Sequence, residues 1–183
     1  MQGQTDPAHW LTYFDAEQGF AISYPAGFRL AKVPIEHIVR GAVVTFIPTA
    51  NPLTEAFGER TNLIEFSVSI GVTHLSGPRH LGAAPLPAAH LTRGLADQQN
   101  EAGGLHFFRS YAVEGAMGNR YETISYCTDY SGRRYEICLF LHTGNPSIYE
   151  PGSITVFDPD MLIGLLEAMV RTFFPIGQSA HLG

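Results

Sequence analysis

Positive charge is scarce in this sequence. Eleven Lys and Arg stand against 17 Asp and Glu, so the formal net charge is −6, and Lys32 is the only lysine. The basic residues are also scattered along the chain, with Arg133-Arg134 as the only adjacent pair. Nucleic-acid binding needs an excess of Lys and Arg on one face to neutralise phosphates. The composition therefore argues against a nucleic-acid partner.

Long hydrophobic runs are also absent. No stretch approaches the ~20 apolar residues that a transmembrane helix needs, and no signal peptide is visible. A polar segment, "MQGQTDPAHW", precedes the first strand-like pattern. Two interpretations stay open. One is an extracytoplasmic (periplasmic or secreted) protein whose export signal was removed, with membrane tethering by an absent N-terminal lipid anchor as one form of it. The other is a cytoplasmic protein with an irregular start.

Catalytic and cofactor motifs are missing as well. The sequence has no G-x-S-x-G element, no P-loop and no Rossmann glycine pattern, so we predict no cofactor and no catalytic residue. Glu114 and Glu122 fall on neighbouring predicted strands, where they could act as general acid and base. We interpret them instead as solvated carboxylates.

Histidine is abundant, with eight residues, but none shows the i, i+2 or i, i+4 spacing typical of metal ligands. We expect exposed or loop histidines and no metal. An alternative hypothesis is a metal-assisted hydrolase with histidines from loops, which requires at least two of them to converge near a carboxylate. The candidates are His74 and His80, which flank a Gly/Pro-rich loop, and His106 and His142, which could meet across neighbouring strands.

Alternation of large and small residues indicates a mainly β protein. The 183 residues suit a single domain over 10–176, with a poorly ordered segment at 1–9 and a tail at 177–183. Residues 105–114, 120–130 and 134–142 read as three consecutive antiparallel strands. Further strands are predicted at these ranges: 10–14, 20–24, 42–47 and 63–72. The strand at 20–24 ends at Tyr24-Pro25, because proline has no N–H to donate.

Two helices are predicted beside these strands. A weaker pattern at 90–100 is followed by Gly103-Gly104. The stronger pattern begins at Asp158-Pro159, where Asp158 suits the N-cap, and carries an apolar stripe to Phe173. The pattern therefore predicts an α+β fold, a single antiparallel sheet of about six or seven strands with helices packed on it.

The two cysteines, Cys127 and Cys138, lie on neighbouring predicted strands. In one possible register, the residue numbers of cross-strand partners sum to 265, and the hairpin turn falls at Gly132-Arg133. This register sets the two cysteines directly opposite each other, where a disulfide is possible. A register summing to 263 pairs Asp129 with Arg134 and leaves two free, buried thiols. A disulfide would favour an oxidising compartment.

The N-terminal stretch "YFDAEQGFAISYPAGF" resembles the start of PsbP-like domains and their bacterial extracytoplasmic, lipoprotein-type relatives. These open with Y-x-D-x-x-x-G-[FY]-x-[FIV]-x-Y-P-x-G-[WF], and Phe28 stands where Trp is commoner. "LLEAMVRTFFP" is similar to the closing helix of that family. The resemblance implies an α/β sandwich, an antiparallel sheet with helices packed on it, and a protein that binds or assembles rather than catalyses. The matching positions are Tyr13, Asp15, Gly19, Phe20, Ile22, Tyr24, Pro25, Gly27 and Phe28 at the start, and Thr172, Phe173 and Phe174 at the end.

These observations lead to a first hypothesis of a non-catalytic, exported binding or accessory domain with an unknown protein or small-molecule partner. Its contact surface is expected on the exposed sheet face or on the 48–61 and 75–89 loops. The alternatives are the loop-histidine hydrolase and a structural or oligomerisation domain that uses its sheet edges.

Overall fold

Antiparallel strands dominate the fold. The computed structural model describes residues 9–31, 39, 41–49, 61–75, 99–102 and 104–176. Residues 1–8 of the predicted N-terminal segment 1–9, the tail 177–183, His80 and most of the 48–61 and 75–89 loops lie outside the described residues. The elements, in chain order, are β1 Trp10–Asp15, β2 Phe20–Pro25, β3 Phe28–Ala31, β4 Ala42–Pro48, β5 Leu63–His74, β6 Gln99–Ala102, β7 Leu105–Ala116, β8 Asn119–Tyr130, β9 Arg133–Gly144, the short 3₁₀ turn η2 Pro146–Ile148, α2 Asp160–Arg171 and β10 Phe174–Pro175.

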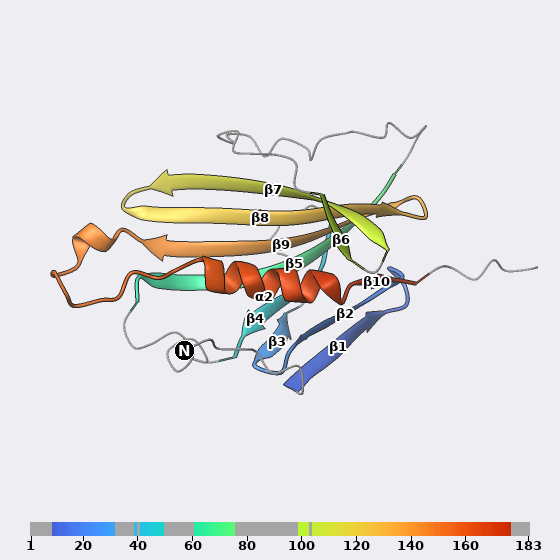
Figure 1. Cartoon of the computed structure of the whole chain (residues 1–183), viewed down its shortest axis with the longest axis horizontal. Helices are drawn as coiled ribbons and strands as arrows, with labels where there is room; N and C mark the ends of the chain where they lie inside the picture. The colour runs from blue at the N-terminus through green and yellow to red at the C-terminus, as the bar shows by residue number, and fades with distance from the viewer. Residues whose placement is uncertain are drawn as a thin grey trace, which may run out of the picture.

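The strands form two sheets rather than the single sheet that the sequence predicted. A seven-stranded sheet has the order β3-β4-β5-β9-β8-β7-β6, and a three-stranded sheet has the order β1-β2-β10 (Figure 1). Consecutive pairing of β7, β8 and β9 confirms the predicted antiparallel meander. The seven-stranded sheet agrees with the predicted strand number.

The Tyr24-Pro25 corner is where the chain leaves the small sheet for the large one. Strand β2 ends at Pro25, and β3 begins at Phe28 and pairs with β4. The Ala26 N–H donates to the His9 carbonyl at 2.9 Å, which holds the corner against the start of β1. Phe28 is buried and packs edge-on against Phe66, with ring centroids 5.7 Å apart. The aromatic residue after the glycine therefore anchors the crossing between sheets.

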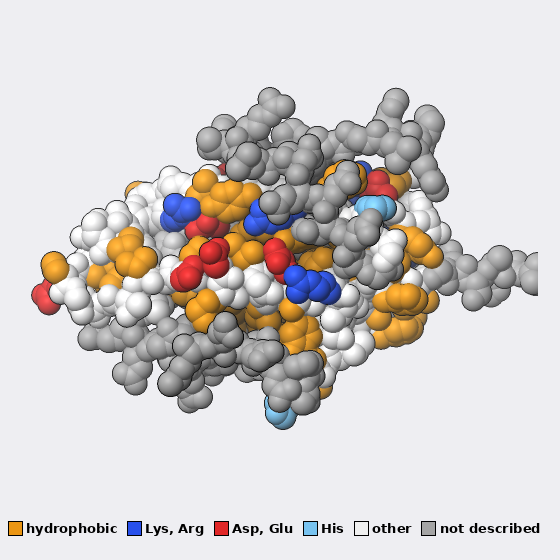
Figure 2. All heavy atoms as spheres, in the orientation of Figure 1, with side chains coloured by type: hydrophobic (Ala, Val, Ile, Leu, Met, Phe, Trp, Pro, Cys, Tyr) orange, Lys and Arg blue, Asp and Glu red, His pale blue; other side chains and the backbone are white. Residues whose placement is uncertain are grey.

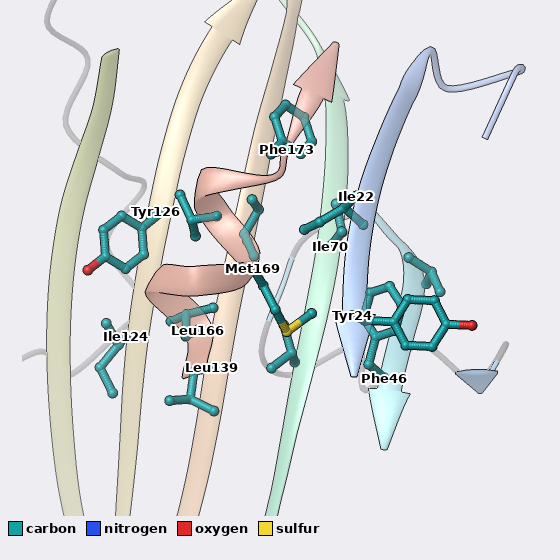
Figure 3. Close-up of a cluster of buried hydrophobic side chains, with 14 of the residues drawn as sticks. Ile22, Tyr24, Phe46, Ile70, Ile124, Tyr126, Leu139, Leu166, Met169 and Phe173 are labelled. Carbon is teal, nitrogen blue, oxygen red and sulfur yellow. The ribbon is translucent and has the colours of Figure 1, made fainter. Parts of the chain in front are cut away.

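Helix α2 and the small sheet lie side by side on one face of the large sheet (Figure 1). Beneath the helix, Leu166 points toward Ile124 and Leu139 of the large sheet, and beneath the small sheet Tyr24 meets Phe46 at 4.8 Å (Figure 3). Phe173, at the end of the helix, stacks on Phe20 at 5.7 Å and joins the two parts. The helix residues buried in this core are Leu162, Leu166, Met169 and Val170.

The C-terminal helix is confirmed, with a small shift at its start. The first helical residue is Asp160, preceded by Pro159 at the N-cap. Asp158, predicted as the N-cap, still accepts a hydrogen bond from the Asp160 N–H at 3.0 Å. Its carboxylate therefore satisfies one of the free amides at the helix start.

The predicted helix at 90–100 is wrong where the structure describes it. Gln99–Ala102 form strand β6, which pairs with the start of β7, and residues 90–98 lie outside the described residues. Gly104, at φ +77°, sits in the turn between the two strands. A glycine with positive φ serves a hairpin turn as well as a helix end.

The numbers of paired residues in β8 and β9 sum to 263, so the alternative register of 265, which sets the two cysteines opposite each other, is wrong. Cys127 lies opposite Glu136, and Cys138 lies opposite Ser125; both cysteines are free thiols. Two features favour this register. Asp129 pairs with Arg134 at 2.8 Å. Positive φ angles of 49° at Ser131 and 77° at Gly132 give the two-residue turn the left-handed conformation that hairpins prefer.

Candidate functional site

The β7–β8 end of the large sheet carries polar side chains on the same face as α2. Figure 1 shows α2 running alongside these strands rather than across them. Figure 2, in the same orientation, shows side chains of both charges gathered beside the helix. The register sets Arg109 opposite Tyr126 and Tyr111 opposite Ile124, whose side chain is in the core, so all point to the helix side. We call this set the β7–β8 strip: Arg109, Tyr111, Arg120, Glu122 and Tyr126.

Glu122 is the centre of the strip. Its side chain is 7% exposed, although glutamate is rarely buried without partners. Arg120 donates from Nε to Glu122 Oε1 at 2.8 Å and from Nη2 to Oε2 at 3.2 Å, a two-pronged ion pair. The Tyr111 hydroxyl donates to Oε2. Arg120 Nη2 also donates to the Tyr111 oxygen at 3.1 Å, which closes a three-residue network.

This network fixes the charge of Glu122 and Tyr111. Burial disfavours the glutamate anion, but hydrogen bonds from Arg120 and Tyr111 outweigh it and hold the pKa of Glu122 below its ordinary value. Burial, together with the hydrogen bond to Glu122, raises the pKa of Tyr111. At neutral pH the carboxylate is therefore an anion and the phenol a neutral donor.

A second group links the strip to the helix. The Tyr126 hydroxyl donates to Glu167 Oε1 at 2.9 Å, and Glu167 Oε2 lies 3.6 Å from Arg171 Nη2. Burial and the hydrogen bond to Glu167 raise the pKa of Tyr126 to about 12. Arg109 faces Tyr126, and its Nε is buried with no hydrogen-bond partner among the described residues.

These protonation states suit recognition better than proton transfer. A general acid or base works best when its pKa lies near the working pH. The pKa of Glu122 is lowered, and that of Tyr126 is raised to about 12, so both move away from neutrality. The strip therefore presents fixed donors and acceptors.

Sequence reasoning missed Glu122. We predicted it and Glu114 as solvated carboxylates, which is right for the exposed Glu114 and wrong for Glu122. Glu114 pairs with Tyr121, and Glu122 pairs with Val113, so the two carboxylates point to opposite faces and cannot act together. The available signal was "RYE": Arg120 and Glu122 are two residues apart, and therefore on one face of a strand.

The candidate histidines do not converge where the structure describes them. His106 lies two residues before Phe108, and Phe108 pairs with Cys127 of β8. His142 pairs with Tyr121 of the same strand. Those two β8 positions are six residues apart, about 20 Å along a strand. His74 lies opposite Arg133 at the end of β5. Among the residues described, no group of three His, Cys, Asp or Glu could hold a metal ion.

His142 has other partners. Its ring stacks on Tyr121 with centroids 4.5 Å apart, and its Nε2 lies 3.1 Å from Asn119 Oδ1. Its Nδ1 lies 3.7 Å from Glu65 Oε1. These contacts are on the face of the sheet opposite the strip, because His142 alternates with the core residue Leu141.

The free cysteines lie on that same opposite face and are poor nucleophiles. Burial is the main cause that raises the pKa of Cys127 to about 12, and burial also raises the pKa of Cys138. The reactive form of cysteine is the thiolate, so both are inert in the folded state. Neighbouring Glu136 is partly buried, and this desolvation raises its pKa.

Comparison with known proteins identifies the fold. No protein-family model matches the sequence, and no curated protein matches it. Among solved structures, the chain is similar to the solution structure of cyanobacterial PsbP (CyanoP) from Synechocystis sp. PCC 6803, with a TM-score of 0.50 and 14% identity over 96% of this chain and 97% of that one. The chain therefore has a PsbP-like fold, as the sequence resemblance implied.

A second structure is larger. It is a crystal structure at 1.50 Å resolution of a protein from Bacteroides thetaiotaomicron VPI-5482, with a TM-score of 0.54 and 9% identity. The match covers 93% of this chain but 50% of that chain, so this chain spans about half of that protein.

Proposed function

We propose that this chain is a non-catalytic binding domain that contacts its partner through the β7–β8 strip. The observation that carries the proposal is the Tyr111–Arg120–Glu122 network, an ordered polar group on a sheet face beside the helix. A buried carboxylate is costly unless it is paired and hydrogen-bonded. Here it holds two partners in place at the margin of the core, which suits a preformed contact surface.

The expected partner presents hydrogen-bond acceptors. Glu122 and Glu167 are already engaged by Arg120, Tyr111, Tyr126 and Arg171. Arg109 is the donor left to offer, because the residue is partly exposed and the ion pairs of these two carboxylates are with Arg120 and Arg171. A guanidinium binds carboxylates and carbonyls well, since its donors are planar and fixed. A protein loop with an exposed acidic side chain, or a small carboxylate, would fit.

An extracytoplasmic location is part of the proposal. It is supported by the resemblance of the N-terminal motif and by the PsbP-like fold. The free thiols of Cys127 and Cys138 add no support for an oxidising compartment. Fractionation of cells that make the protein naturally tests this point. Recovery in the cytosolic fraction alone would contradict export, and it would leave the contact surface to be judged separately.

The contact surface can be tested with neighbouring residues that point to opposite faces. A photo-crosslinking amino acid at Val113 lies beside the strip, opposite Glu122, whereas one at Glu114 lies on the other face. We expect a discrete crosslinked species in native cells from position 113, reduced by an added Arg109→Glu substitution. Equal crosslinking from positions 113 and 114, or a yield that Arg109→Glu leaves unchanged, would refute the assignment.

The enzyme alternative has its own test. If the strip were catalytic, Glu122 would be its only buried carboxylate among the described residues of that surface. We expect purified protein to show no hydrolase turnover on a broad ester, phosphoester and glycoside panel. A turnover that Glu122→Gln abolishes, in a variant that keeps its circular dichroism spectrum, would show that the domain is catalytic.

A further inference from the structure

Strand β1 is an open edge of the small sheet. In the order β1-β2-β10, β1 pairs only with β2 among the described strands. The Ala26 N–H donates to the His9 carbonyl, so these two residues form a hydrogen-bonded pair. This bond shows which residues of β1 direct their backbone groups toward β2 and which direct them away. Antiparallel pairs alternate, so the N–H and C=O of every second residue point away from β2. In β1 these are the backbone groups of Trp10, Thr12 and Phe14.

A second contact confirms this phase. The Thr12 and Ser23 hydroxyl oxygens are 3.4 Å apart, and the two residues are paired in the register. Side chains approach closely at the non-hydrogen-bonded positions of an antiparallel pair. The backbone groups of Thr12 therefore do not bond to β2 and are directed to the edge.

Strand β1 lacks the features that prevent an edge strand from pairing with another chain. Natural edge strands are protected by lysine, proline or a bulge. "WLTYFD" has no lysine and no proline, and its pairing with β2 runs from Trp10 to Asp15 without a register shift. Two large apolar side chains on it are exposed to solvent, Leu11 at 48% and Phe14 at 61%.

The exposed apolar surface continues across the small sheet. Phe14 and Phe174 both lie opposite Ala21, so the two rings flank a small residue in one cross-strand row. Phe174 is also 61% exposed. In Figure 2, apolar side chains gather at the end of the molecule where β1, β2 and β10 lie.

We propose that β1 pairs with β1 of a second copy of this chain, antiparallel and about a two-fold axis at Thr12. The register follows from the backbone. Residues whose groups face the edge must pair with each other, and centring on Thr12 pairs all three of them. The small sheets of the two copies then form one six-stranded sheet.

A second copy of β1 fits this edge because the side chains of the strand are complementary to themselves in the antiparallel register. In this register Phe14 lies beside the partner's Trp10, and Leu11 lies beside the partner's Tyr13. The acidic Asp15 lies opposite the partner's His9, the one basic side chain in residues 9–15, and no two like charges of this segment face each other. A shift by two residues in either direction would unpair an edge-facing residue and lose the Asp15–His9 match.

Cysteine crosslinking tests the register directly. In Thr12→Cys the two introduced thiols face each other across the axis, with Cα atoms about 5.5 Å apart, which a disulfide can bridge. In the control Leu11→Cys, each thiol faces Tyr13 instead, and the two thiols are too far apart. We expect a covalent dimer from Thr12→Cys under mild oxidation, and far less from Leu11→Cys. Similar yields from both variants would overturn the register.

The mass in solution tests the dimer itself. We expect analytical ultracentrifugation to show a concentration-dependent dimer that Thr12→Val retains. Thr12→Lys places two like charges opposite each other, and Thr12→Pro removes an N–H that β2 does not use; each should raise the dissociation constant about tenfold. A monomer at every concentration, or a dimer indifferent to both substitutions, would refute the proposal. The β7–β8 strip lies on the other sheet, so neither result bears on the proposed function.

Discussion

The hydroxyl of Tyr126 on β8 donates to Oε1 of Glu167 on α2 at 2.9 Å. This bond stands at the boundary between the apolar core and the polar strip. Leu166, the preceding helix residue, is fully buried against the sheet, while Glu167 is turned to the margin of the helix. The helix thus buries its apolar stripe against the sheet, and Glu167 beside that stripe hydrogen-bonds to the β7–β8 strip.

Tyr126→Phe removes this bond and should destabilise the protein by about 1–2 kcal/mol, because a hydrogen bond to a charged acceptor is lost. The ring stays in place, so packing is unchanged. Urea unfolding at pH 7 measures the effect. As a control, Arg171→Ala breaks the exposed helix pair with Glu167 and should cost less than about 0.5 kcal/mol. A Tyr126→Phe value as small as the control would mean that the bond does not hold the helix.

Glu122 should make stability depend on pH in the acid range. Its pKa is below the ordinary value of 4.5 in the folded state, so the unfolded chain binds the proton more readily. The carboxylate therefore contributes stability that is fully present above about pH 4.5 and is lost as pH falls through the folded pKa. We expect the stability advantage of wild type over Glu122→Gln to shrink on acidification. Urea unfolding between pH 7 and pH 3 measures it.

The same residue should be sensitive to truncation at neutral pH. Glu122→Ala leaves the Tyr111 hydroxyl and the Arg120 guanidinium without their acceptor, which should cost about 2–3 kcal/mol. Glu114→Ala, a carboxylate exposed on the opposite face, should change stability by less than about 0.5 kcal/mol. Equal losses of stability from Glu122→Ala and Glu114→Ala would contradict the network. So would a stability advantage of wild type over Glu122→Gln that grows as the pH falls.

The sequence predicted strand positions and faces better than it predicted pairing. Alternation identified β2 and β5 because each strand places its large apolar side chains on one face, and the apolar stripe identified α2. The two candidate registers of β8 and β9 differ by two residues, a shift that keeps every side chain on its own face. Ile124 and Tyr126 therefore face the core in either case. Hydrophobic pattern alone cannot separate such registers; the turn and the Asp129–Arg134 pair decide.

The division into two sheets was beyond the sequence because it depends on contacts between distant segments. Strand β10 pairs with β2 across almost the whole chain, through Phe174 and Ala21. The burial of Glu122 was hidden for a similar reason. Its environment is set in part by Tyr111 on the neighbouring strand, 11 residues away along the chain. A local pattern shows a glutamate on a strand and says nothing of its depth.

The cysteines offer a test of the observed register. Both thiols are free, and burial raises the pKa of each, that of Cys127 to about 12. We expect two reactive thiols per chain in denaturant without reductant, and slow reaction in the folded state. The single variant Cys127→Ala should then titrate as one thiol. A chain with no titratable thiol in denaturant would restore the disulfide and the register in which the cysteines face each other.

Leu166 tests the central packing of the fold, the helix against the large sheet. Its side chain is fully buried and points between Ile124 and Leu139 (Figure 3). Leu166→Ala should destabilise by about 2–5 kcal/mol, because the surrounding strands are rigid and a cavity remains. Met161→Ala on the same helix, where the side chain is 46% exposed, should cost less than about 1 kcal/mol. Urea unfolding of both variants provides the comparison. Equal small losses would mean that the helix does not pack on this sheet, and the PsbP-like arrangement would then have to be abandoned.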